Sequence, residues 1–459
     1  MAVDAGTARS RFRTDGAIAQ RAFDHQRTDR PGMPIHLGVA LLACVAASGP
    51  ISVLEFVFAF ALLAPLSRIV MTWRLWTTMF RQPVFLAALA WAGWTALSIL
   101  WSPDRDAGWR ELGALRWAGW FFILWPMMER RPTLVIAWAV GFVLGHLSQA
   151  GHGLALMVGE EHAPAWLLFD RAHDRVTGWF GPVSGGTAMC AILGLHLHQA
   201  ATRTGRVRLI AGVLGAVTLA GIVATGTRGA WLAAGGVVLI AGVLAASAAA
   251  GAGRKRGALA AIGVLLFAIV AGGVLAGPRV ASRIADARAE IADASRGEMD
   301  TNIGARIVMA QEALRMGASR PIGGVGVGGY RATATERLHE EGVAEPQRLI
   351  HSHAHSTPLH VFATTGFVGL ALWTLLIVCV FRALLSRLPG ERNTYDAGLW
   401  LAFAGLLLAG MFETLHVGSR IGAHFWLLLA FATAWRPMPN PLRHGRPGIR
   451  IRKPDRSAQ

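Results

Sequence analysis

Long apolar runs recur along almost the whole chain and restrict it to one class of fold. Each run is close to the roughly 20 residues that a helix needs to cross about 30 Å of hydrocarbon, where the backbone must satisfy its own hydrogen bonds. Hydrophobic residues make up 53% of the 459 residues and charged residues only 15%, whereas soluble domains carry about 25% charged residues. We therefore predict an all-α polytopic membrane protein with about twelve transmembrane helices, at 34–48, 51–67, 83–101, 113–128, 133–157, 185–201, 209–226, 230–250, 257–277, 357–381, 396–414 and 422–435.

Basic residues indicate how these helices are oriented. Arginines crowd the first 33 residues, and no small-residue cleavage site follows the first apolar run, so no removable signal peptide is expected. Further basic clusters recur in every second connection, which is typical of cytoplasmic loops. The predicted organisation is a basic cytoplasmic segment (1–33), nine helices (34–277), a large outside loop (278–356), three helices (357–435) and a basic cytoplasmic tail (436–459).

The net charge of +17 is a surface property of these loops. The excess basic residues lie in short cytoplasmic connections and in the tail, where anionic membrane lipid accounts for them. A nucleic-acid partner is therefore not expected. Three cysteines, Cys44, Cys190 and Cys379, all fall within apolar runs, which does not indicate a disulfide framework.

The large outside loop contains ten arginines and ten carboxylates, so its net charge is near zero. An arginine that binds a ligand here must act through its position. Apolar residues at helical spacing predict two amphipathic helices, the second beginning at Asp300, Thr301 or Asn302, and a third helical piece near 331–341. The apolar positions are Val280, Ile284, Ala287 and Ile291 in the first helix and Ile303, Ile307, Ala310 and Leu314 in the second.

A glycine-rich stretch, GGVGVGGY at 323–330, follows the second of these helices. It contains a GxGxxG spacing, but a dinucleotide site is excluded because the stretch follows a helix on the outer side of the membrane. A tight turn remains, which lets either a helix or a phosphate approach the bare backbone. Of these two, helix packing is favoured.

Three histidines at alternate positions, His351, His353 and His355, precede the apolar run at 357–381. His351 and His355 would share one face of a helix and could ligate a metal, with Glu345 nearby, but Pro358 argues against a long helix there. Solvated loop histidines are the second alternative. A catalytic role for at least one of the three is the favoured interpretation.

Several charged residues are predicted at the outer ends of the helices. Arg228 lies in a short turn, TGTRGAW, where an unpaired guanidinium is costly unless it reaches the lipid headgroups. Arg175 precedes a Gly/Pro turn and could simply begin a helix. Glu55 and Glu413 could each pair with an arginine. His146, His196 and His198 lie inside apolar runs and are expected to be hydrogen-bonded core residues.

One spacing resembles a known family. His355, Ser356, nine residues, Gly366, two residues and Gly369 are similar to the H-[N/S/Q]-x9-G-x-x-G pattern of the O-antigen ligase and polymerase superfamily. The segments TRGAW, GARIVMAQEAL with PIGGVGVGGY, and RVTGWFGPVSG also resemble that family, so the resemblance covers essentially the whole chain. The chain departs from it at Val183, where the family often has asparagine.

The resemblance implies a GT-C-like glycosyltransferase in the bacterial inner membrane, with both termini cytoplasmic and an active site that faces the periplasm. Among the branches, the chain is most similar to the O-antigen ligase. That enzyme transfers glycan from undecaprenyl diphosphate to the lipid A core, and the resemblance implies inversion at the anomeric carbon without a metal or another cofactor. An O-antigen polymerase and a polysaccharide or lipid transporter are the alternatives.

Roles for individual residues follow from this resemblance together with their chemistry. His355 is predicted to be the general base, because a neutral imidazole can take the proton of a sugar hydroxyl. Arg228, Arg283 and Arg306 are predicted to bind the diphosphate, because a guanidinium binds phosphate oxygens in pairs. Further residues that could line the site are Arg175, His351, His353, Ser356, Tyr330 and Arg420.

Overall fold

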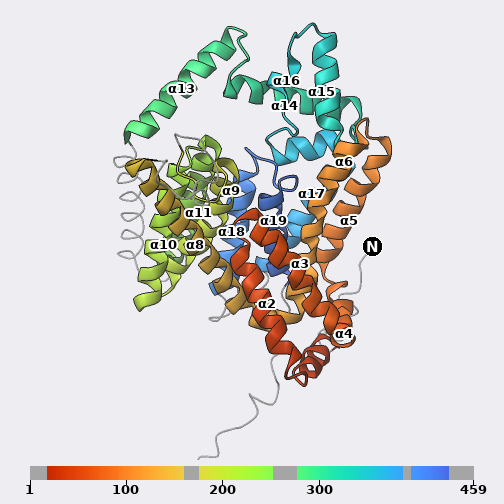
Figure 1. Ribbon diagram of the computed structural model, residues 1–459, viewed down its shortest axis with the longest axis vertical. Helices are drawn as coiled ribbons and strands as arrows, with labels where there is room; N and C mark the ends of the chain where they lie inside the picture. Colours follow the sequence, from red (N-terminus) through yellow and green to blue (C-terminus); the bar gives the residue numbers. More distant parts are fainter. Residues whose placement is uncertain (1–17, 160–174, 252–276, 386–393, 434–459) are drawn as a thin grey trace, which may run out of the picture.

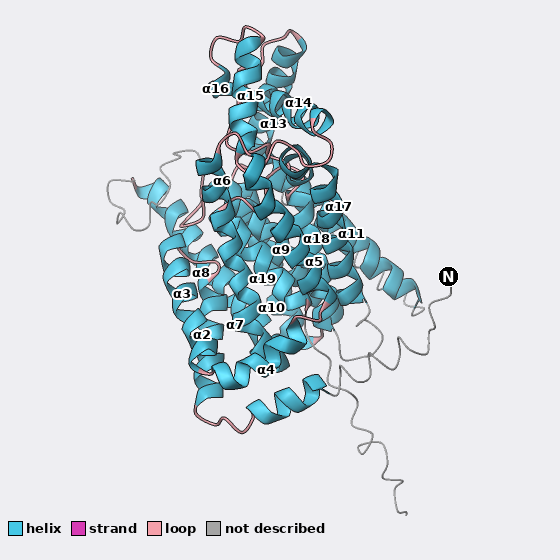
Figure 2. Cartoon of the chain, turned by 90° about the vertical axis from the view of Figure 1, so that its right-hand side faces the viewer, coloured by secondary structure: helices cyan, strands magenta, loops and turns pink. Residues whose placement is uncertain are grey.

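The computed structural model describes residues 18–159, 175–251, 277–385 and 394–433, and every regular element in these ranges is a helix. The helices run mostly side by side in a bundle, with a separate helical layer at one end (Figures 1 and 2). In chain order they are α2 (Gly32–Ala46), α3 (Ile51–Ser67), α4 (Ile69–Met79), α5 (Pro83–Leu97), η1 (Ser98–Trp101), α6 (Arg105–Leu112), η2 (Gly113–Ala118), α7 (Gly119–Leu124), η3 (Trp125–Arg130), α8 (Arg131–Val158), α9 (Pro182–Thr202), α10 (Gly205–Ala224), α11 (Arg228–Gly251), α13 (Gly277–Ser295), α14 (Asn302–Ser319), α15 (Gly329–Glu340), α16 (Pro346–Leu349), α17 (Thr357–Leu385), α18 (Thr394–Ala409) and α19 (Ser419–Ala432).

The described residues show fewer membrane spans than the twelve that were predicted. Within the described residues, five helical segments are long and apolar enough to cross a membrane, or six if α3 and α4, which are bent by 102° at their junction, form one span. The predicted run at 257–277 lies outside the described residues except for its last position. Each of the other predicted runs coincides with helix, but α2, α18 and α19 are short, with 10–17 residues in their apolar parts. The apolar helices indicate an integral membrane protein, and twelve complete spans are not shown.

Helix α9 explains why the length of an apolar run is by itself a poor predictor of a membrane span in this protein. It packs against α10, α11 and α18, and 13 of its 21 residues are buried. A Cβ on Gly194 of α9 would lie 2.6 Å from the carbonyl oxygen of Leu401 in α18, and a Cβ on Gly405 of α18 would collide with the carbonyl of Cys190. Small residues thus let the two backbones touch, as is common between membrane helices. Because protein surrounds α9, it can carry buried polar side chains such as His196.

Replacing Gly194 by leucine is expected to destabilise the bundle by about 1–3 kcal/mol or more, because the new side chain cannot fit between the α9 and α18 backbones. The measurement is the melting temperature of the purified protein in detergent. Gly212→Leu in α10 is the matched control, since a Cβ there would meet no atom within 4 Å. Equal melting temperatures for the two variants would contradict this packing.

The helical layer consists of α13, α14, α15 and α16, at the upper end of the bundle in Figure 1. These helices confirm the three helical pieces predicted for the large loop, and Thr301 is the N-cap of α14, where its Oγ1 accepts from the backbone N–H of Gly304 at 3.0 Å. The predicted apolar face of α14 is wrong, because Ile307 and Leu314 are 38% and 51% exposed. The buried face carries smaller or unbranched residues, which allow α14 to pack closely on α17: Ala305, Val308, Met309, Ala313, Met316 and Gly317.

The glycine-rich stretch is a packing turn beside α17. Gly324, Gly326 and Gly328 all have positive φ, and the N–H groups of Val325 and Gly326 donate to carbonyls of α17 at 2.9 Å. Helix α17 is itself broken at Gly366, where φ is +66° and ψ is −165°. A Cβ at Gly366 would collide with the carbonyl of Ile322, so the backbone contact requires glycine on both sides. The favoured packing interpretation therefore agrees with the structure.

Candidate functional site

Two loops meet at the end of the bundle beneath the helical layer. One precedes α17 and carries the three alternate histidines, and the other connects α18 to α19. Thr357 joins them: its N–H donates to the carbonyl of Gly410 at 2.8 Å, its hydroxyl donates to the carbonyl of Glu413 at 2.8 Å, and the same hydroxyl accepts from the N–H of Leu415 at 3.0 Å. The first residue of α17 thus fixes the second loop against the first.

His355 and Glu413 form a hydrogen-bonded pair. Nδ1 of His355 lies 3.0 Å from Oε2 of Glu413, and because a carboxylate only accepts, Nδ1 carries the proton and donates it. The N–H of Thr414 donates to Oε1 of Glu413 at 3.0 Å. Burial acts to raise the pKa of Glu413, but the hydrogen bond from His355, the charges of His353 and His355 and the N–H of Thr414 together outweigh it, so this pKa lies below its usual value. The carboxylate is therefore ionised, buried and fully oriented.

The backbone of His355 is unusual. Its φ of +48° is the one positive value for a non-glycine residue among the described residues. Such conformations are uncommon outside glycine and tend to cluster at functional sites, where surrounding contacts hold them. Here the contact with Glu413 and the adjacent clamp at Thr357 supply that support.

The other two histidines also face this pair. Nδ1 of His351 lies 3.2 Å from Nε2 of His355, and His351 is exposed. Nε2 of His353 lies 3.5 Å from Oε1 of Glu413, and its ring centroid lies 4.3 Å from that of His355. Burial lowers the pKa of His353 to about 4, so its imidazole is neutral at ordinary pH. The structure therefore brings all three predicted histidines together.

Arg306 of α14 reaches the same loop. Its Nη1 donates to the carbonyl of Phe412 at 2.8 Å, one residue before Glu413. Burial lowers the pKa of Arg306, the charge of Glu413 opposes this change, and the charge of Arg228 adds to it. Arg306 is thus a partly buried cation close to both the His355–Glu413 pair and Arg228.

Arg228, at the start of α11, makes a two-pronged ion pair. Its Nη2 and Nη1 donate to the two carboxylate oxygens of Glu290 in α13, at 2.7 and 3.1 Å. Oε2 of Glu290 also accepts from the N–H of Ile303 at 3.0 Å. The alternative that Arg228 binds only lipid headgroups does not hold, because both terminal nitrogens of its guanidinium donate to the carboxylate of Glu290.

Arg175 and Arg283 lie beside the turn that precedes Arg228. A Cβ on Gly226 would lie 3.6 Å from Cγ of Arg175 and 3.8 Å from Nη2 of Arg283. Nη1 of Arg283 is 4.0 Å from Asp286 on the same helix. The three arginines therefore surround one short turn.

Three other predicted lining residues have structural contacts. The hydroxyl of Tyr330 is buried and donates to the carbonyl of Met309 at 2.7 Å, which fixes α15 on α14. Ser356 is buried, and its carbonyl accepts the first N–H bond of α17. Arg420 donates to the carbonyl of Trp179 at 2.6 Å and covers the ring of Phe180.

The remaining charged and polar expectations have mixed outcomes. Glu55 pairs with Arg116 at 2.5 Å, as expected. For Glu413 the expected arginine partner is wrong, since its direct partner is His355 and Arg306 binds the neighbouring carbonyl. His146 is a hydrogen-bonded core residue, with Gln149 and Thr218 each at 3.0 Å, as predicted.

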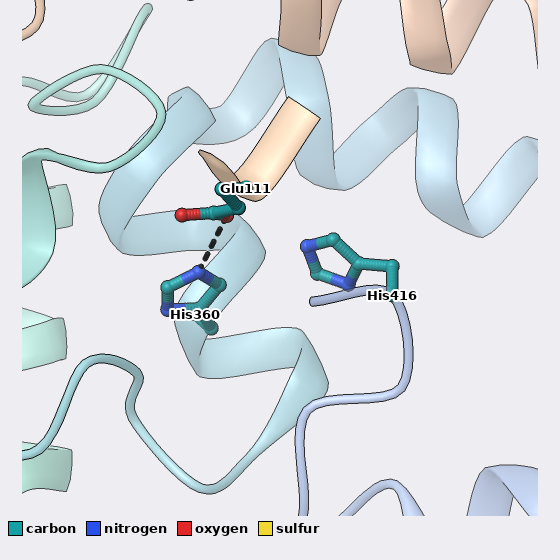
Figure 3. A group of neighbouring side chains, drawn as sticks. All are labelled: Glu111, His360 and His416. Atoms are coloured by element: carbon teal, nitrogen blue, oxygen red, sulfur yellow. Dashed lines mark hydrogen bonds and ion pairs between the residues drawn. The ribbon is translucent and has the colours of Figure 1, made fainter. Parts of the chain in front are cut away.

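Sequence reasoning did not identify a second cluster, which contains Glu111 of α6, His360 of α17 and His416 of the α18–α19 loop (Figure 3). Nε2 of His360 lies 3.0 Å from Oε1 of Glu111, and the ring of His416 points toward this pair. The sequence signal for His360 is its position as the next histidine after His351, His353 and His355. The sequence gives no signal for its carboxylate partner, because Glu111 is 249 residues away in the chain.

Two groups in the described residues have metal-ligating atoms within 4.8 Å of one another. One is Glu111, His360 and His416, and the other is His353, His355 and Glu413. The metal alternative considered for His351 and His355 on one helix face does not apply, because these residues lie in a loop.

Comparison with protein families gives a match over part of the chain. Residues 185–374 match the family model described as O-antigen ligase. The match begins in α9 and ends in α17, so it includes Arg228, Arg306 and His355 and excludes Glu111 and Glu413. No curated protein matches the chain.

Proposed function

We propose that this chain transfers a glycan from undecaprenyl diphosphate to a sugar hydroxyl of the lipid A core, and the match of residues 185–374 to the O-antigen ligase family model supports this proposal. The observation that carries the proposal is the oriented pair of His355 and Glu413, with Arg306 beside it, at one end of an apolar helix bundle. Donor and acceptor are both lipid-anchored, so they can meet only at the membrane edge. The enzyme works in the bacterial inner membrane with this end facing the periplasm.

The hydrogen-bond pattern supports Nε2 of His355 as the atom that acts as the base. With the Nδ1 proton of His355 donated to Glu413, the lone pair of a neutral ring is on Nε2. That atom accepts from Nδ1 of His351 at 3.2 Å in the structure, and the acceptor hydroxyl takes this place when it binds. Nε2 then removes the hydroxyl proton while the oxygen attacks the anomeric carbon, and ionised Glu413 stabilises the imidazolium that forms.

The leaving group is undecaprenyl diphosphate, whose charge grows as the sugar to phosphate bond breaks. Fixed cations close to that bond stabilise the transition state more than the ground state. The position of Arg306 supports this role, because its guanidinium is partly buried beside the α18–α19 loop that carries Glu413. Arg228 contributes if a phosphate replaces the carboxylate of Glu290 on its guanidinium, and Arg283 lies beside the same turn. Attack opposite the diphosphate inverts the anomeric centre.

Arg306→Ala is expected to lower kcat/KM for transfer by about 10²–10³-fold, the effect of removing one preorganised donor to a developing charge. Arg306→Lys should restore part of this loss, because it keeps the charge without the planar fork. The measurement is transfer by purified protein in detergent from a lipid-linked donor to a lipid A core acceptor. Arg315→Ala, on the exposed side of the same helix, is the control. Wild-type kinetics in Arg306→Ala would contradict the role.

The same assay and a gene deletion separate the candidate activities. Deletion of an O-antigen ligase leaves bare core, whereas deletion of a polymerase leaves core capped with one repeat unit. A transporter yields no covalent product with purified donor and acceptor. Bare core together with a covalent product in vitro supports the proposed reaction.

A further inference from the structure

The buried cluster of Glu111, His360 and His416 takes no part in the reaction proposed above. Its three residues come from α6, α17 and the α18–α19 loop, and they face one another in a small volume (Figure 3). Their ligating atoms all lie within 4.8 Å of one another. Two imidazoles and one carboxylate are the protein ligands of a common class of zinc site.

The cluster leaves hydrogen-bonding capacity unused. His416 is only 5% exposed, and its Nδ1 atom has no hydrogen-bond partner within the described ranges. His360 is completely buried, and within the same ranges its Nδ1 atom also has no partner. A buried polar group normally has a partner, because leaving it without one costs free energy. A ligand at the centre of the cluster would bond to the ring nitrogen of His416 that faces Glu111 and His360 in Figure 3.

The carboxylate of Glu111 is already held by a hydrogen bond to the oxygen that does not face His360. Oε2 of Glu111 accepts from the N–H of Gly328 in the glycine-rich turn at 3.1 Å, while Oε1 faces His360. A ligating carboxylate held by a backbone N–H is the usual arrangement around protein-bound metals. One oxygen of Glu111 is therefore anchored, and the other points into the cluster.

We propose that Glu111, His360 and His416 bind one divalent transition-metal ion of the zinc class, with water completing the coordination. Binding replaces the hydrogen bond between His360 and Glu111 with two bonds to the ion, and the ring proton of His360 moves from Nε2 to Nδ1, which leaves the lone pair of Nε2 for the ion. Zinc to nitrogen distances are about 2.0–2.1 Å, so small side-chain rotations bring the three atoms to the ion. The site is structural, because the ion does not touch the reacting atoms.

The ion would hold the α18–α19 loop, which carries Glu413, against the helix bundle. His416 is three residues after Glu413, and the ring of His360 lies 6.4 Å from that of His353, which in turn lies 4.3 Å from His355. An ion held by α6, α17 and this loop therefore limits the motion of the carboxylate that orients His355. The metal site stands independently of which glycan acceptor the enzyme uses.

The first test is metal content. Full-length protein, purified through a tag without histidines and dialysed against Zn²⁺-containing and then metal-free buffer, is analysed by inductively coupled plasma mass spectrometry. Wild-type protein is expected to retain about one Zn²⁺ per chain, and His416→Ala to lose it. His339→Ala, at an exposed position of α15, and Glu413→Gln, in the neighbouring histidine group, should both retain the ion. Loss in Glu413→Gln with retention in His416→Ala would move the site and overturn the proposal.

The second test needs no variant. X-ray absorption at the zinc edge of the wild-type protein should show two imidazole nitrogens and oxygen ligands at about 2.0–2.2 Å. A spectrum without imidazole scattering, or a wild-type protein that retains no metal after equilibration with Zn²⁺, would refute the proposal. Normal transfer by metal-free protein would leave the proposed reaction intact, so the two hypotheses can fail separately.

Discussion

Replacing His355 by alanine is expected to lower glycan transfer by about 10²–10⁴-fold, the usual contribution of a positioned general base. The acceptor hydroxyl then has no group to take its proton, although the arginines that bind the donor remain. The measurement is kcat for purified protein, together with lipopolysaccharide ladders in a null strain that expresses the variant. The expected result is bare core at normal protein abundance.

The control for this variant is His339→Ala, which removes an exposed histidine of the same large loop. It should give normal ladders. The melting temperature of His355→Ala is expected to fall, because the buried carboxylate of Glu413 loses its hydrogen bond to Nδ1, so kcat is compared at a temperature at which both proteins are folded. Normal ladders from His355→Ala would overturn its role as the base.

Glu413→Gln is expected to lower kcat by about 10²–10⁴-fold while the KM for the donor changes little. A glutamine amide can donate to Nδ1 of His355, which moves the ring proton to Nε2 and removes the lone pair needed by the base. It also removes the charge that stabilises the imidazolium. The clamp from Thr357 uses the backbone carbonyl of Glu413 and is retained in the variant. Glu341→Gln, at an exposed position, is the matched control and should leave kcat unchanged.

Glu413→Gln is also expected to change how the stability of the protein depends on pH. The pKa of Glu413 in the folded protein lies below its usual value, so its ionised form adds stability that is fully present above the pKa of an unfolded glutamate. This stability is lost as the pH falls through the lowered pKa. The melting temperature of Glu413→Gln should therefore be below that of the wild type at neutral pH, and the difference should shrink in acid. A constant difference across this range would mean that the charge of Glu413 adds nothing to folding.

Local pattern determined much of this protein. Apolar runs predicted helices because a backbone in hydrocarbon must bond to itself, and each predicted run in the described residues is helical. Periodic apolar residues and a cap at Asp300, Thr301 or Asn302 predicted α14, and the family resemblance carried by the spacing from His355 to Gly366 predicted the candidate base. The structure adds the reason for that spacing, because α17 opens at Gly366 to receive the glycine-rich turn.

Contacts between distant segments decided the rest. Sequence could not show that Glu413 orients His355 or that Glu111 faces His360, because these partners are 58 and 249 residues apart. It also gave the wrong buried face for α14, because burial depends on which helices surround an element. Hydropathy predicted twelve membrane spans, of which the described residues show five or six. Periodicity and hydropathy report the environment that a segment can tolerate, whereas only packing determines the environment it receives.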